Sequence, residues 1–102
     1  MSNLHTVNKS PFEKNALSSC LEHATDGASV LLFEDGIYAA LRGTEVADKV
    51  ERAMGAVKVF VLGEDLKARG FGEDRLISGI SVVDYAGFVD LAAEADAVQA
   101  WL

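Results

Sequence analysis

The stretches SVLLFE, residues 29–34, and VKVFVL, residues 57–62, decide the fold. Each contains a run of apolar residues in place of a regular alternation of apolar and polar ones. A strand with one face in water alternates, whereas a strand in a parallel sheet is covered on both faces and is apolar throughout. The two stretches therefore predict central strands of a parallel sheet.

Three further apolar runs extend this sheet. They lie at residues 4–7, 80–84 and 97–102, and helical segments separate the five expected strands. Alternation of strand and helix favours a doubly wound sheet with right-handed crossovers. We therefore expect one α/β domain over residues 1–102, a small, mainly parallel five-stranded sheet with helices on both faces.

Capping signals mark the expected helices. The sequence SPFE places Ser10 at the N-cap, Pro11 at the first helical position and Glu13 two positions later, which predicts a helix of about four turns. Further helices are expected at residues 44–54, 63–70 and 85–94, the last one capped by Asp84.

The sequence FEDGIYAALRG, residues 33–43, comes directly after the second expected strand. Ligand sites of open parallel sheets lie beyond the carboxyl ends of the strands, so we expect this loop to border a functional crevice. Its acidic residues, Glu34 and Asp35, are interpreted as caps of a short helix over residues 36–41.

The charge balance restricts the possible partners. Nine basic and sixteen acidic residues give a net charge of -7, which disfavours binding to nucleic acid and to anionic membranes. No apolar stretch approaches the ~20 residues of a membrane span and no targeting signal is visible, so we expect a cytoplasmic protein.

Signatures of cofactor and metal sites are absent. The sequence has neither GxGxxG nor GxxxxGK[ST], so no nucleotide cofactor is expected, and a general small-ligand-binding role ranks last among the candidate functions. The two histidines, His5 and His23, are 18 residues apart and only one cysteine, Cys20, is available, which makes a metal site within this chain improbable. His5 is expected to be a structural histidine.

Cys20 is the only cysteine and has two interpretations. Helical periodicity places it inside the apolar arc formed with Leu17 and Leu21, which favours a packing role. Against this, His23 lies three residues further along the same helix, and an imidazolium beside a thiol makes thiolate available. A single cysteine also restricts any thiol chemistry to reactions between molecules.

Several segments resemble the DsrH/TusB family of sulfur-relay proteins, and in particular the DsrH subunit of sulfur-oxidising bacteria. They are LHTVNKSPF, LLFEDGIYAA, VLGEDLKARG, VVDYAGFVDL and AVQAWL, and they occur in the same order along essentially the whole chain.

The resemblance implies a DsrE-like fold and a place in a heterohexamer with DsrE-like and DsrF-like subunits. Such a complex would pass sulfur as a cysteine persulfide to or from a DsrC/TusE-like partner during sulfur oxidation. The position of Cys20 resembles that of the DsrH-type cysteine, which makes it a candidate auxiliary persulfide carrier supported by His23. The alternative is a non-catalytic scaffold subunit, with the sulfur carried by a sister chain.

The chain also holds more large apolar side chains than so small a body easily buries. We expect some of them to lie in subunit contacts: Phe12, Ile37, Tyr38, Phe71, Phe88 and Trp101.

Overall fold

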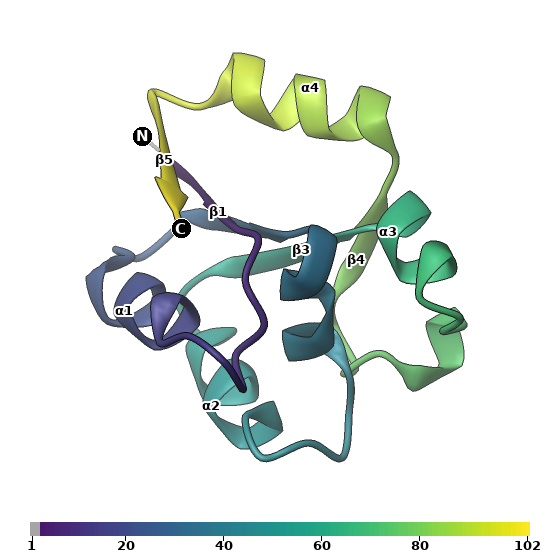
Figure 1. Cartoon of the computed structure of the whole chain (residues 1–102). Helices are drawn as coiled ribbons and strands as arrows, with labels where there is room; N and C mark the ends of the chain where they lie inside the picture. Colours follow the sequence, from purple (N-terminus) through teal and green to yellow (C-terminus); the bar gives the residue numbers. More distant parts are fainter. Residues whose placement is uncertain (1–2) are drawn as a thin grey trace.

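The computed structural model describes residues 3–102 and contains, within them, one five-stranded sheet (Figure 1). The strands are β1 (Asn3–Val7), β2 (Ser29–Leu32), β3 (Lys58–Leu62), β4 (Ser81–Val83) and β5 (Ala97–Trp101). Each apolar run that predicted a strand forms one, with ends that differ by one or two residues.

The sheet has the order β4-β3-β2-β1-β5, and every neighbouring pair of strands is parallel. The chain first builds outward from β1 through β2 and β3 to β4. It then returns through the helix α4 (Tyr85–Glu94) to place β5 on the other side of β1. This reversal of direction confirms the doubly wound α/β fold.

One face of the sheet is covered by three elements: α1 (Ala16–His23), the 3-10 helix η1 (Glu34–Ala40) and α2 (Ala47–Ala53). Alternate residues of the central strands point to this side, and they form the main hydrophobic core with the buried residues of the three elements. The strand residues in this core are Val7, Val30, Leu32, Val59 and Val61.

The opposite face carries α4, which runs from one edge strand to the other (Figure 1). Helix α3 (Gly63–Ala68) and the short 3-10 helix η2 (Glu73–Arg75) lie near β4. No helix among residues 3–102 has the length and hydropathy needed to cross a membrane.

The start of the first helix was predicted wrongly. Residues 11–13 form a turn in which the Ser10 hydroxyl accepts a hydrogen bond from the Phe12 N–H (3.2 Å), and α1 begins only at Ala16. Its N-cap, Asn15, makes no side-chain capping bond. The local Ser-Pro signal is therefore satisfied by a turn, and α1 has eight residues in place of about four turns.

The second expected helix is also shorter, because α2 begins at Ala47 and the Thr44 hydroxyl instead donates to the Leu41 carbonyl. The last two helices agree with the sequence. The Asp84 side chain accepts a hydrogen bond from the Gly87 N–H at 2.8 Å and caps α4 as predicted. Helix α3 is followed by a turn that ends at Gly70, which has a φ of 82°.

Candidate functional site

Cys20 lies on the face of α1 that packs against the sheet. Its side chain is fully buried, at 0% exposure, within the main hydrophobic core. Removal from water disfavours the thiolate and raises the pKa of Cys20 to about 12. The thiol is therefore neutral at neutral pH and has no path to a partner while α1 is folded in this position.

His23, the expected supporting residue, is exposed and contacts Ser19 and Trp101. Its Nδ1 lies 2.7 Å from the carbonyl oxygen of Ser19, one turn earlier, and its ring packs on Trp101 with centroids 5.5 Å apart. Nothing in the described chain joins it to Cys20. The role of this pair in sulfur chemistry stays a prediction.

The second histidine is part of a structural contact that closes the C-terminal strand onto β1. The indole N–H of Trp101 donates to Nδ1 of His5 at 3.1 Å, across 96 positions of sequence. His5 is buried, and loss of hydration lowers its pKa below the usual value. The sequence prediction of a structural histidine agrees with this arrangement, but nothing local in the sequence identified its partner.

At the carboxyl ends of β2 and β3, acidic residues link two helices. Asp35 forms an ion pair of 3.0 Å with Arg69, and the Asp65 carboxylate accepts a hydrogen bond from the Glu34 N–H at 2.6 Å. No side chain caps η1, so the capping role expected for Glu34 and Asp35 is wrong. Both residues serve instead to fasten α3 to η1.

Backbone geometry is unusual at the same place. Glu34 has a φ of 47°, in the left-handed region of backbone conformation that residues other than glycine rarely adopt. Nearby, Asn8 donates to Glu34 Oε1 at 3.4 Å, while its own buried Oδ1 has no partner. Gly36 comes so close to the β1 backbone that a Cβ would collide with the carbonyl oxygen of Val7.

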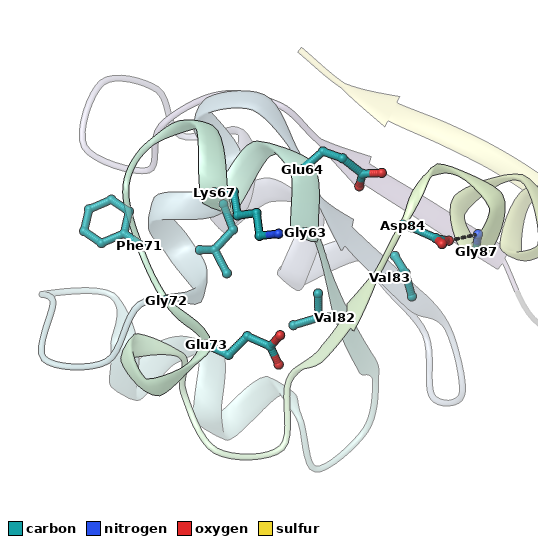
Figure 2. A pocket seen from close by; sticks show the side chains of 11 residues that line it. Gly63, Glu64, Lys67, Phe71, Gly72, Glu73, Val82, Val83, Asp84 and Gly87 are labelled. Atoms are coloured by element: carbon teal, nitrogen blue, oxygen red, sulfur yellow. Dashed lines mark hydrogen bonds between the residues drawn. The ribbon is translucent and has the colours of Figure 1, made fainter.

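A cavity of about 700 Å³ opens beside β4 (Figure 2). It lies between α3, η2 and the first turn of α4, at the carboxyl ends of β3 and β4, where a parallel sheet is expected to bind ligands. The loop of residues 33–43 does not line it. The loop expected to border a functional crevice lies at the same edge of the sheet, outside this cavity.

Among residues 3–102 there is no cluster of three or more His, Cys, Asp or Glu side chains that could hold a metal ion. The arrangement around Cys20 consequently offers one buried thiol and no metal ligand set.

The apolar residues expected at subunit contacts are distributed unevenly. Ile37 is fully buried and belongs to the core, so it is not among the residues left for a subunit contact. Phe12 is 53% exposed, and further large apolar side chains that the sequence did not single out are also exposed: Tyr85, Val89, Val98 and Leu102. Two of these lie on α4, a helix in which no residue is buried.

Comparison with known proteins gives the family. The model described as "DsrH like protein" matches residues 9–98. The chain belongs to the DsrH/TusB family. Protein TusB of Pectobacterium parmentieri is 33% identical over 98 residues, covering 96% of this chain and 99% of the relative. Protein TusB of Escherichia coli O1:K1 is 34% identical with the same coverage. Membership of this family implies a sulfur-relay function.

Solved structures confirm the fold. The ychN protein from E. coli superposes with a TM-score of 0.79 at 19% identity, over 98% of this chain and 99% of that one. A protein of unknown function from Methanobacterium thermoautotrophicum superposes with a TM-score of 0.70 at 17% identity, over 96% of both chains. At these identities the similarity concerns the fold alone.

Proposed function

We propose that the chain is a subunit of a cytoplasmic sulfur-transfer assembly built with DsrE-like and DsrF-like sister chains, which passes sulfur to or from a DsrC/TusE-like partner in sulfur oxidation. The observation that carries this proposal is the DsrH family match over residues 9–98. The single cysteine is consistent with it, because relay between molecules needs only one thiol on each participating chain.

The outer surface of α4 supports the assembly part of the proposal. Tyr85 and Val89 lie one turn apart and are 56% and 64% exposed. A helix of such apolar composition gains little stability unless it is buried on at least one side. A sister subunit that covers these residues would remove them from water.

Within this assembly the state of Cys20 favours the scaffold alternative. A persulfide carrier needs a thiol that a partner's sulfur can reach and that ionises near neutral pH. Cys20 has 0% exposure and a pKa raised to about 12 by burial. For Cys20 to act as an auxiliary carrier, contact with a partner must first move α1 away from the sheet.

Sulfur trapping on the intact assembly tests the proposal. The chain is co-purified with its sister subunits, exposed to a persulfide donor, and each subunit is weighed by mass spectrometry. We expect added sulfur on a sister subunit, and sulfur transfer to the DsrC/TusE-like partner that persists after Cys20→Ser. If no subunit of the assembly acquires sulfur, the sulfur-relay proposal is contradicted. Loss of transfer in an intact assembly that carries Cys20→Ser would make Cys20 the carrier.

The relatives at 33–34% identity are named TusB, which favours tRNA thiolation as a second destination for the sulfur. Deletion of the gene separates the two uses. Loss of thionucleosides from bulk tRNA indicates tRNA thiolation, whereas impaired oxidation of stored or reduced sulfur with normal tRNA indicates a role in sulfur oxidation.

A further inference from the structure

The cavity beside β4 contains a cation and an anion that have no partner in the protein. Lys67 on α3 and Glu73 in η2 both line it. Within residues 3–102 neither side chain forms a hydrogen bond or an ion pair, with each other or with any other residue. Figure 2 shows the Lys67 ammonium and the Glu73 carboxylate directed into the cavity from above and below in that view.

An apolar surface lies between these two charges. Val82 supplies it in the view of Figure 2, while Leu66 and Phe71 also line the cavity and the Phe71 ring lies to the left of Lys67 in that view. The Phe71 ring is fixed from outside the cavity, because Tyr38 contacts it edge-on with centroids 6.0 Å apart and the Arg75 guanidinium lies 5.7 Å from its centre. These contacts hold the Phe71 ring at the border of the cavity.

The other two carboxylates of the cavity are already engaged. Asp84 accepts a hydrogen bond from the Gly87 N–H at 2.8 Å, and Glu64 accepts one from the Tyr85 N–H at 3.4 Å. Both bonds satisfy donors at the N-terminus of α4, so this helix end is neutralised by the chain's own side chains. Lys67 is then the group in the cavity that can receive a ligand's carboxylate, and Glu73 the carboxylate that can receive an ammonium.

The cavity is large enough for a small organic ligand. Its volume of about 700 Å³ lies within the range of about 300–1,000 Å³ typical of small-molecule sites. We propose that this cavity binds a short zwitterionic peptide, with its carboxylate at Lys67, its ammonium at Glu73 and an apolar side chain against Val82. The proposal concerns a separate site from Cys20 and does not depend on sulfur relay.

The test uses the tripeptide Gly-Leu-Gly and three relatives that each lack one feature. N-acetyl-Gly-Leu-Gly lacks the ammonium, Gly-Leu-Gly-amide lacks the carboxylate, and Gly-Gly-Gly lacks the apolar side chain. Each is titrated into the ¹⁵N-labelled full chain, free or in the assembly in which it purifies, and backbone amide shifts are followed. We expect Gly-Leu-Gly to shift amides of the lining residues and to bind more tightly than all three relatives.

Charge-removing variants assign the two contacts. Because a charge-assisted hydrogen bond from an exposed side chain contributes modestly, Lys67→Met and Glu73→Gln should each weaken binding about threefold to tenfold. The matched controls Lys14→Met and Glu13→Gln, at exposed positions outside the cavity, should bind as the unchanged protein does. Absence of shifts at the lining residues, or equal binding by the cavity variants and the controls, would overturn the proposal.

Discussion

The helices on the two faces of the sheet are buried to very different degrees, although strand residues on both faces, such as Leu31 and Leu32, have 0% exposure. On the α1, η1 and α2 face, core residues such as Cys20, Leu32 and Ile37 have 0% exposure. On the α4 face a single helix does the covering, none of its residues is buried, and a cavity of about 180 Å³ lies between it and the sheet, lined among others by Leu4, Phe60 and Leu91.

This difference shows that apolar composition alone does not tell which helix is buried. The apolar residues of α1 are buried inside the chain, whereas Tyr85 and Val89 of α4 stay exposed. The α1 face accordingly contains the main core of the chain, and the exposed residues of α4 are available for assembly.

The largest expected effect concerns the complete face. Leu32→Ala removes a fully buried side chain from the main core, and truncation of this kind costs about 2–5 kcal/mol. Chemical denaturation of the purified variant measures this loss. A loss below about 1 kcal/mol would mean that the core collapses around the missing side chain and that this face is less tightly packed than described.

The next effect concerns the α4 face. Val89→Glu places a charge at a position that is 64% exposed in the chain alone, so its stability should change by no more than about 0.5 kcal/mol. A buried, unpaired carboxylate is costly, so assembly with sister subunits should weaken by at least about tenfold.

Ala56→Glu is the matched control for Val89→Glu, since it adds the same charge at an exposed loop position. Native mass spectrometry compares the two variants. Equal assembly by both would remove α4 from the proposed contact.

Cys20→Ser returns to the α1 face with a smaller change. A hydroxyl without a partner in this apolar setting should lower stability by about 1–2 kcal/mol. In the folded chain iodoacetamide should modify Cys20 slowly, and denaturant should accelerate the reaction greatly. Rapid modification of the native chain would contradict the buried position.

The raised pKa of Cys20 also has a pH consequence. Its value moves from 9.0 to about 12 on burial, so the folded state holds this proton more firmly than the unfolded state does. The resulting stability is complete below pH 9 and is lost as the pH rises towards 12. Denaturation curves across this window should therefore show a decline in the unchanged protein that Cys20→Ser lacks.

Trp101→Phe tests the contact that holds β5 against β1. It removes the indole donor to His5 and should cost about 1 kcal/mol. Because burial lowers the pKa of His5 from 6.5, the stabilisation by neutral His5 is present above pH 6.5 and is lost as the pH falls through the lowered value. Trp101 is the only tryptophan, so its fluorescence in the unchanged protein follows this loss during acid titration, while chemical denaturation followed by circular dichroism measures the cost of Trp101→Phe. A fluorescence signal that does not change with pH between neutrality and unfolding would contradict the expected loss.

Asp35→Asn should have the smallest effect. Its ion pair with Arg69 is half-exposed, with the Asp35 side chain at 57%, and such pairs contribute about 0–1 kcal/mol. Thermal melting should therefore change little. A large loss would show that the link between α3 and η1 is central to the fold.

The strands were predictable because a strand of a covered parallel sheet is apolar whichever strands lie beside it. The start of α1 was not, since Ser10 bonds to its own turn. The role of Asp35 was missed because its partner, Arg69, lies 34 residues away, and the contact between His5 and Trp101 spans nearly the whole chain. Such pairings depend on the order of strands in the sheet, which the local pattern does not contain.

Hydrogen exchange of α4 tests the central claim most directly, namely that this helix is covered by a sister subunit. The chain is labelled alone and after mixing with DsrE-like and DsrF-like chains, and the exchange of α4 is compared with that of α1. We expect α4 to gain protection on mixing, while α1, already packed on the sheet, changes little. Unchanged exchange in α4 within a fully formed assembly would contradict the account.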